Sequence, residues 1–335
     1  MRKMERRDFL YTLSGSLVAF SFLIFPNSGK RKIHSVNAEK EEGEPEIVVK
    51  VLGTAQDGGL PHFACFCRNC LRARKESQFS RLISSLALID LKERIFFMLD
   101  ATPDIRHQLD IALERLGVEK ARSKYLPQAV ILTHAHIGHY TGLIFFSYEA
   151  ISSSDLPVYC SKRMKNFLVN NGPWNQLVRL KNISIQTISY DQKFSLTPQL
   201  SLTPFQVPHR DEYSDTLGFT ISGRRKKLLY IPDIQSWKAW KKSIVEEVKN
   251  VDIALIDGTF YSPEELPGRD LSQIGHPFIK SSLELLRKAV REGAAKIYFT
   301  HLNHSNLALN PEGKEQKEIK NEGFELASEG MEFYL

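Results

Sequence analysis

The chain has 335 residues, 42% of them hydrophobic, which is enough apolar material for a large core. The formal net charge is +6, but residues 1–38 hold 7 basic against 2 acidic residues, leaving 38 against 37 in the remainder. Because the basic excess belongs to the first 38 residues, the charge does not indicate a nucleic-acid partner. No linker-like stretch divides residues 46–335, so we expect one domain there, preceded by a short spacer at residues 39–45.

The first 38 residues have the pattern of an export signal. Four basic side chains precede the apolar residues 10–25, and Val36-Asn37-Ala38 places small residues at the cleavage positions. Residues 6–10, Arg-Arg-Asp-Phe-Leu, resemble the motif read by the twin-arginine export machinery. The apolar stretch is interrupted by polar residues and is shorter than the ~20 residues of a membrane span, which favours a cleaved signal over a stable anchor. We therefore expect an exported, periplasmic protein.

Three cysteines lie close together in Cys65-Phe66-Cys67-Arg68-Asn69-Cys70. This spacing lets one tight loop place three sulfurs around a zinc ion, with a fourth ligand from elsewhere. The best candidate for that ligand is His304, three residues after another candidate ligand, His301. A disulfide or plain buried cysteines are the alternatives, but an odd number of closely spaced thiols fits a disulfide framework poorly. The cluster predicts a structural zinc site.

A histidine cluster follows the apolar residues 129–132. His134, His136 and His139 are three of the chain's 10 histidines and lie within six residues. Imidazole is the commonest protein ligand for catalytic zinc and also suits iron. The alternative is three unrelated histidines, but chance seldom places such a cluster at the end of a strand. The run predicts a metal site.

Three further candidate ligands each close a short apolar run. They are His209, Asp233 and His301. Taken alone, a histidine or aspartate at the end of a strand is more often a cap or a surface residue. Together with the histidine cluster they supply enough ligands for two metal ions.

In this order, the motifs resemble the metallo-β-lactamase superfamily, whose pattern is HxHxDH, a distant His, an Asp and a final His. The resemblance covers nearly all of residues 46–335. It implies that His134, His136 and His209 bind one metal, that His139 and His301 bind a second, and that Asp233 bridges both. Asp100 falls where the family keeps a structural aspartate beside the site. The chain departs from the pattern at Gly138, which stands where the family has a metal-binding aspartate.

Other segments resemble two branches of that superfamily. Residues 52–62 look like the opening of the B protein of pyrroloquinoline quinone biosynthesis and of the cyclic-phosphate phosphodiesterase of the carbon–phosphorus lyase pathway. Residues 257–261 and 274–277 are closer to the first branch, whereas the His134–His136 pair and His304 are closer to the second, which also carries a Cys3His zinc. The glycines at 53–59 match neither common nucleotide-binding loop, so we do not expect a nucleotide.

The hydrophobic pattern agrees with the α/β fold that the resemblance implies, a single-domain, four-layer αββα sandwich with metals at the strand ends between two sheets. Predicted strands cover residues 47–52, 85–89, 95–99, 129–132, 158–160, 184–188, 201–207, 217–222, 228–231, 253–256 and 297–299. Predicted helices cover residues 103–116, 140–150, 162–170, 237–248 and 278–292. We interpret Trp237 and Trp240 as the buried face of one helix.

Metal ions held by these groups lower the pKa of bound water to about 7, which supplies hydroxide at neutral pH for attack on a carbonyl or phosphoryl group. His276 corresponds in order to a histidine that acts as general acid in the phosphodiesterase branch, so we predict that it protonates the leaving group. The alternative is that His276 caps a helix or positions substrate. Asp257 and Tyr261 are weaker candidates for the same pocket.

Three functions remain open from the sequence. The first is a hydrolase of small phosphodiesters or esters that uses one or two divalent metals, Zn, Mn or Fe. The second is an oxidative enzyme like the quinone-biosynthesis branch, because two imidazoles and a carboxylate are ligands typical of non-haem iron oxygenases. The third is a non-catalytic metal- or ligand-binding protein. With Gly138 in the pattern, we expect a weaker second metal site, which Gly138→Asp should tighten.

Overall fold

The computed structural model describes residues 46–117 and 125–335. The predicted export signal at residues 1–38 and the spacer at residues 39–45 therefore lie outside the described part of the chain. Within the described part, no helix is both long and apolar enough to cross a membrane.

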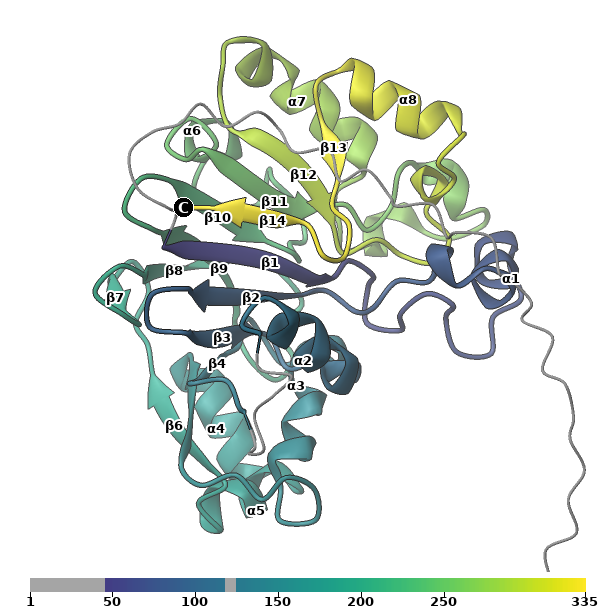
Figure 1. The fold of residues 1–335 in the computed structure, drawn as a ribbon. Helices are drawn as coiled ribbons and strands as arrows, with labels where there is room; N and C mark the ends of the chain where they lie inside the picture. Colours follow the sequence, from purple (N-terminus) through teal and green to yellow (C-terminus); the bar gives the residue numbers. More distant parts are fainter. Residues whose placement is uncertain (1–45, 118–124) are drawn as a thin grey trace, which may run out of the picture. The chain divides into compact units, whose positions relative to one another are not determined.

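Two mixed β-sheets form the centre of the fold (Figure 1). In the described chain, the first sheet runs in the order β14 (Glu332–Tyr334), β1 (Ile47–Gly53), β2 (Ser85–Asp90), β3 (Ile95–Leu99), β4 (Val130–Ile131), β5 (Leu156–Cys160) and β6 (Ile183–Thr187). The second runs β13 (Glu325–Leu326), β12 (Lys296–Thr300), β11 (Ile253–Asp257), β10 (Lys227–Ile231), β9 (Thr216–Ser222), β8 (Ser201–Val207) and β7 (Phe194–Ser195).

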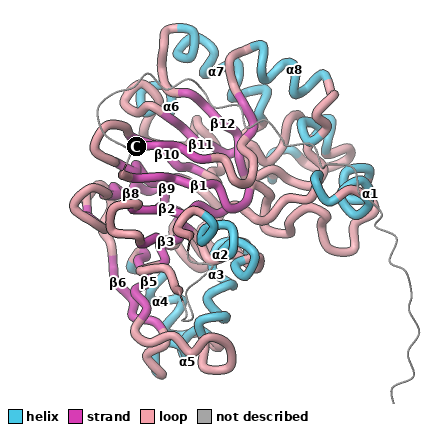
Figure 2. The backbone as a smooth tube through the Cα atoms, in the orientation of Figure 1, coloured by secondary structure: helices cyan, strands magenta, loops and turns pink. Residues whose placement is uncertain are grey.

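Helices cover the outer faces of the two sheets, as the tube in Figure 2 also shows. The described helices are α1 (Arg68–Lys75), α2 (Ile105–Glu114), α3 (Ile137–Tyr140), α4 (Lys162–Asn170), α5 (Trp174–Arg179), α6 (Ile244–Glu247), α7 (Ile279–Arg291) and α8 (Lys314–Asn321). Of these, α1 lies beyond the ends of the strands (Figure 1). One apolar cluster joins the first sheet to α2, α4 and α5, and another joins the second sheet to α6, α7 and α8. A third cluster contains side chains of both sheets and is the interface between them. These four layers confirm the predicted αββα sandwich.

The distribution of apolar residues explains why the predicted elements form. Strand β1 is buried along its whole length, as expected of a strand covered on both faces. Helix α7 buries Ile279, Leu283, Leu286 and Ala289, which recur at the spacing of one helix face. Every predicted strand has a counterpart, and the helices predicted at residues 103–116, 162–170 and 278–292 are confirmed as α2, α4 and α7. The short strands β7, β13 and β14 and the helices α1, α5 and α8 were not predicted.

Two predicted helices were wrong. Residues 140–150 form only the end of α3 and a 3-10 turn at Thr141–Phe146, because the Gly142 amide donates to Ala101 O (2.9 Å) rather than to a carbonyl one helical turn earlier. Residues 237–248 form turns that end in α6. Trp237 and Trp240 are buried as expected, but their indole N–H groups donate to Ser282 Oγ (2.9 Å) and Gln206 O (3.0 Å), which hold the segment in turns.

The sheet topology gathers the polar strand ends. Strands β3, β4 and β5 are parallel in the first sheet, and β10, β11 and β12 are parallel in the second. Side chains that follow the carboxyl ends of neighbouring parallel strands share one edge of a sheet. In this fold those edges carry the candidate metal ligands.

Candidate metal centre

The predicted ligands come from both sheets. His134 and His136 follow β4 and His139 lies in α3, whereas the other three follow strands of the second sheet. Those three are His209 after β8, Asp233 after β10 and His301 after β12. All six are buried except His136, which is partly exposed.

Four of these side chains form a first ligand set around Asp233. His134 Nε2 lies 3.2 Å from Asp233 Oδ2, and His209 Nε2 lies 3.2 Å from Asp233 Oδ1. His136 Nδ1 is 3.2 Å from His209 Nε2 and 3.8 Å from Asp233 Oδ2. Ligand atoms about 2.0–2.2 Å from one zinc ion stand roughly 3–3.5 Å apart, so this set fits a single divalent metal.

A second set lies beside the first and contains His139, His301 and Asp57, a residue that the sequence interpretation did not include. His139 Nε2 is 3.6 Å from Asp57 Oδ1, and His301 Nε2 is 3.9 Å from Asp233 Oδ2. Asp233 therefore faces both sets, the position expected of a bridging carboxylate.

The imidazoles of His134 and His301 are held so that their Nε2 atoms face the centre, whereas His136 presents Nδ1. Thr133 donates its hydroxyl proton to Asp100, and its oxygen lies 3.0 Å from His134 Nδ1. Thr259 likewise donates to Asp257 (2.8 Å), and its oxygen lies 3.0 Å from His301 Nδ1. Each threonine oxygen can then accept only an N–H, which places the ring proton on Nδ1 and leaves Nε2 unprotonated.

The unprotonated ring nitrogens have no hydrogen-bond partner among the described residues. Nε2 of His134, His139 and His301 are all buried and unpaired, although His134 Nε2 lies close to Asp233. A buried polar atom without a partner is costly, and metal ions bound at the two ligand sets would satisfy all three. The donor set of imidazoles and carboxylates therefore fits divalent metal ions such as zinc, manganese or iron.

The backbone is strained at two of these positions. Asp100 and His301 have φ angles of 68° and 59°, in the left-handed region that side chains other than glycine seldom adopt. Such conformations cost on the order of 1–3 kcal/mol and cluster at functional sites. At Asp100 this conformation accompanies a contact with His139, whose Nδ1 donates to Asp100 Oδ2 at 2.7 Å.

Electrostatics favour the protonation states that metal binding needs at His134, His301 and Asp233. At His139, burial tends to lower the pKa, but the charge of Asp100 outweighs it and raises the pKa to about 9. Burial lowers the pKa of His134 well below its usual value and also lowers the pKa of His301. Burial tends to raise the pKa of Asp233, but the surrounding histidines, His209 first, hold it well below the usual range. Neutral imidazoles and an ionised carboxylate are the forms that bind metal.

His276 lies beside Asp233, directly before α7. Its Nδ1 is 2.9 Å from Asp257 Oδ2 and 3.3 Å from Asp233 Oδ1. Burial tends to lower the pKa of His276, but the charges of Asp257 and Asp233 outweigh it and raise the pKa to about 9. The ring is thus held at Nδ1, and its other edge carries Nε2. His276 also belongs to a third set of possible metal ligands. Its other members are Asp233, Asp257 and His301, and the four side chains lie close enough to hold one ion.

The predicted zinc cluster is assembled as well. The Sγ atoms of Cys65, Cys67 and Cys70 lie 3.5, 3.5 and 3.7 Å from His304 Nδ1. Zn–S bonds of about 2.3 Å and a Zn–N bond of about 2.0 Å at a tetrahedral angle require a separation of roughly 3.5 Å. The cysteines are free thiols, so the disulfide alternative does not hold in this structure.

Comparison with known proteins identifies the family. A family model described as a β-lactamase superfamily domain matches residues 96–302. The chain belongs to this superfamily. The coenzyme PQQ synthesis protein B of Rhizobium meliloti is 27% identical over 317 residues, covering 87% of this chain and 98% of the relative.

Solved structures show the same fold. Zinc-bound PqqB from Methylobacterium extorquens has a TM-score of 0.71 at 23% identity, covering 86% of this chain and 100% of that one. A diphosphatase from the PhnP family has a TM-score of 0.61 at 19% identity, covering 86% of this chain and 96% of that one. The placement between two branches of the β-lactamase superfamily, predicted from the sequence, is confirmed.

The expectation for Gly138 needs correction. A Cβ atom at Gly138 would stand 2.2 Å from Asp57 Oδ1 and 2.7 Å from Asp57 Cα, so the space that the superfamily fills with an aspartate side chain is taken. Gly138→Asp should therefore produce a steric clash rather than a tighter second site. Sequence reasoning missed Asp57 because it lies 81 residues before Gly138 and matches no part of the HxHxDH motif.

Other predicted and neighbouring residues have clear positions. Asp257 is fully buried and holds His276, whereas Tyr261 donates its hydroxyl proton to Glu318 (2.6 Å) and so faces away from the ligand sets. Glu212 was not predicted. Its carboxylate lies 3.3 Å from His136 Nε2 and is half exposed, which places it at the solvent side of the first ligand set.

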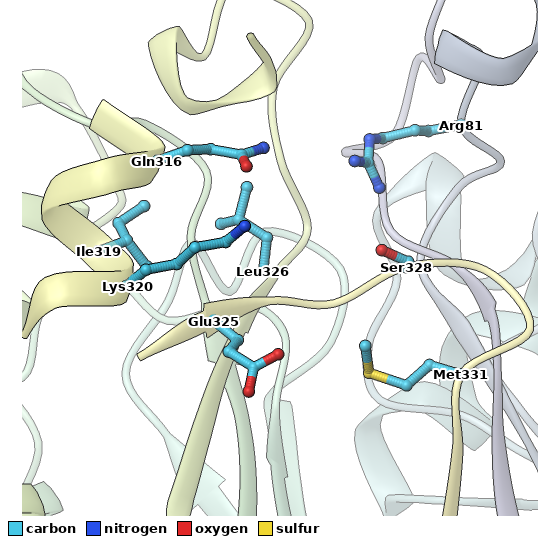
Figure 3. Close-up of a pocket in the computed structure, with 8 residues that line it drawn as sticks. All are labelled: Arg81, Gln316, Ile319, Lys320, Glu325, Leu326, Ser328 and Met331. Atoms are coloured by element: carbon cyan, nitrogen blue, oxygen red, sulfur yellow. The ribbon is translucent and has the colours of Figure 1, made fainter. Parts of the chain in front are cut away.

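A separate pocket of about 210 Å³ is drawn in Figure 3. Side chains of α8 line one side, and Arg81 and the segment after β13 line the other. Arg81 forms an ion pair with Glu329 at 3.7 Å, and Lys320 and Glu325 are also present, so the lining carries both signs of charge. No candidate metal ligand lines this pocket, and we assign it no function.

Proposed function

We propose that the protein is a metal-dependent hydrolase that cleaves small phosphodiesters or esters. The observation that carries the proposal is the pair of adjacent ligand sets, in which Asp233 belongs to the first set and lies 3.9 Å from His301 of the second. Two metal ions held there would activate water and polarise the scissile group. The superfamily membership supports hydrolysis as the reaction class, and the diphosphatase of the PhnP family shares the fold.

His276 is the residue that we propose as proton donor to the leaving group. Asp257 accepts the Nδ1 proton, which fixes the ring and directs the opposite nitrogen, Nε2, away from the carboxylate. Thr259 binds the second oxygen of Asp257 and so stops this carboxylate from rotating. A histidine oriented by a buried carboxylate is suited to general acid catalysis.

The proposal is tested with the purified protein and bis(p-nitrophenyl) phosphate and p-nitrophenyl acetate as probes. We expect release of p-nitrophenol that is lost on dialysis against a chelator and restored by zinc or manganese. The matched control is His209→Ala, which removes a ligand of the first set and should abolish the restored activity. Absence of hydrolysis of both probes by fully metal-loaded wild-type protein would argue against the proposal.

A second candidate is an oxidative role like that proposed for the quinone-biosynthesis branch. The observation in its favour is the 27% identity to a coenzyme PQQ synthesis protein B along nearly its whole length. His139, His301 and a carboxylate are ligand types found in non-haem iron oxygenases. Metal analysis of protein from metal-replete cells separates the two functions, because iron at the centre favours oxidation and zinc or manganese favours hydrolysis.

We also propose that the protein is exported by the twin-arginine machinery and acts in the periplasm. This proposal rests on the sequence of residues 1–38 alone. It is compatible with the zinc cluster, because this route carries folded proteins and lets the thiols bind zinc before they meet an oxidising compartment.

A further inference from the structure

We propose that Asp57 is a ligand of the second metal, taking the place of the aspartate that the superfamily carries at the position of Gly138. The inference rests on the proposed function, which places two metal ions at this centre. Asp57 is not part of the HxHxDH motif of the superfamily. The carboxylate comes from the loop after β1 and not from the motif itself.

The position of the Asp57 carboxylate supports this role. Its Oδ1 lies 3.6 Å from His139 Nε2, and it forms a compact set of possible ligands with His139 and His301. The two histidine Nε2 atoms are buried and have no hydrogen-bond partner in the described chain, so both are available to an ion. Asp57 adds a negative charge to the second set.

Gly138 explains how the exchange is possible. The Gly138 amide donates to Asp57 Oδ1 at 3.1 Å, and no Cβ fits between them. The φ angle of Gly138 lies outside the left-handed region, so the glycine is required by this close approach and not by backbone conformation. An aspartate at 138 and the observed Asp57 are therefore mutually exclusive occupants of one space.

The backbone holds the Asp57 loop against the segment that carries His301. Leu302 N donates to Thr54 O (2.7 Å), and Gln56 N donates to Leu302 O (3.0 Å). The Asn303 side chain also donates to Gln56 Oε1. The residues directly before Asp57 are thus fixed to the segment that carries His301, which places the carboxylate before any metal arrives.

The test compares metal content after dialysis at defined free zinc in three variants. Asp57→Asn keeps an oxygen to accept the Gly138 N–H but removes the charge, and Asp57→Ala removes both. Each should lose one ion per chain and weaken binding of the second ion at least ~10-fold, since even residues that only support a ligand cost that much. The exposed Asp110→Asn on α2 is the matched control and should keep the wild-type content.

A carboxylate exchange gives the sharpest result. Gly138→Asp alone should lose metal or stability, because the new side chain overlaps Asp57. The double variant Asp57→Gly/Gly138→Asp moves the carboxylate to the superfamily position and should regain the second ion. Circular dichroism and retention of the cysteine-site zinc show that each variant is folded.

Two outcomes overturn the inference. One is an Asp57→Asn variant that binds the second ion as tightly as wild type. The other is a double variant that is folded but does not regain the ion lost in Asp57→Gly. Neither depends on catalysis, so a wild type that binds two ions at the centre and hydrolyses nothing would count against the proposed function while leaving the role of Asp57 in place.

Discussion

The candidate metal ligands are held in place by hydrogen bonds to residues that are not ligands themselves. Asp100 accepts from His139 Nδ1 at 2.7 Å and from the Thr133 amide at 2.8 Å. The Thr133 hydroxyl in turn contacts His134. One buried carboxylate therefore orients a histidine of each ligand set, which explains why a strained φ angle is kept at this position.

Replacing Asp100 should weaken metal binding without removing a ligand. Asp100→Asn keeps an oxygen that can accept from the Thr133 amide. It removes the negative charge that accepts the hydrogen bond from His139 Nδ1. We expect the second ion to bind ~10–100-fold more weakly, as for other residues that orient a metal-bound histidine. Calorimetric titration of the metal-free centre measures the affinity, and unchanged binding would refute the orienting role.

His276 should act on the leaving group more than on metal binding. His276→Ala is expected to keep its metal content and to slow turnover by roughly 10² to 10⁴ on substrates with poor leaving groups. Activated aryl esters, whose leaving groups need no proton, should be affected far less. An equal loss on both substrate types would contradict the general-acid role. A loss of one bound ion would instead identify His276 as a ligand, as its place near Asp233 and His301 also allows.

At the scale of elements, two loops serve both the zinc cluster and the metal centre. One loop carries His301 and His304, and the other runs from Asp57 to Cys65. His62 connects them: its ring contacts the tilted ring of His304 at 4.4 Å between centroids, and its amide donates to Cys70 Sγ at 3.3 Å. A Cβ added at Gly58 would stand 2.3 Å from the His62 ring, so this ring packs directly against the residue after Asp57.

Loss of the cysteine-site zinc should destabilise the fold and disturb the Asp57 loop. Structural zinc contributes on the order of 10 kcal/mol in small domains and less where a large core is present. Cys67→Ser is therefore expected to lose one zinc, to melt at a lower temperature and to bind the second ion at the centre more weakly. Cys160→Ser, at a buried thiol outside the cluster, is the comparison variant. Unchanged zinc content in Cys67→Ser would refute the assignment.

At the scale of the whole molecule, the metal centre joins the two sheets. His134, His136 and His139 lie in the segment after β4 of the first sheet, and His209, Asp233 and His301 follow strands of the second. Both sheets already share an apolar interface. An ion bound at this edge would add a polar connection between the same two layers.

Metal binding at the centre should stabilise the folded protein as a unit. An ion present at 100 times its dissociation constant contributes about 2.7 kcal/mol. Metal-free protein first given one equivalent of zinc for its thiols, then titrated with manganese, is expected to show a rising melting temperature. His209→Ala should show a smaller rise. A wild-type melting temperature that does not respond to manganese would contradict this expectation.

The proposed export determines where the whole protein is located, and it rests on residues 1–38. Replacing both Arg6 and Arg7 with lysine should retain the protein in the cytoplasm, because the twin-arginine machinery recognises the arginine pair. Cell fractionation and mass spectrometry of the exported form locate the protein and its new N-terminus, which we expect near Ala38. Unchanged periplasmic accumulation, or an intact leader on the exported form, would argue against this route.

The sequence by itself determined the ligand types, their order and the layered fold. Strand ends are visible as apolar runs that stop at a polar residue, and this local signal located His134, His209, Asp233 and His301. The Cys65–Cys70 cluster was equally local, since its three thiols lie within six consecutive residues. The family resemblance then supplied the pairing of distant residues.

Only the tertiary structure decided which residue stands beside Gly138. The Asp57 loop reaches it because β1 and the His301 segment hold that loop at the strand ends, a contact across 81 residues that no periodicity encodes. The same reason explains the two wrong helices. At Gly142 a backbone hydrogen bond to a distant carbonyl replaces the local one that a helix needs, and at Trp240 the indole N–H binds the distant Gln206 carbonyl; local pattern carries no information about such partners.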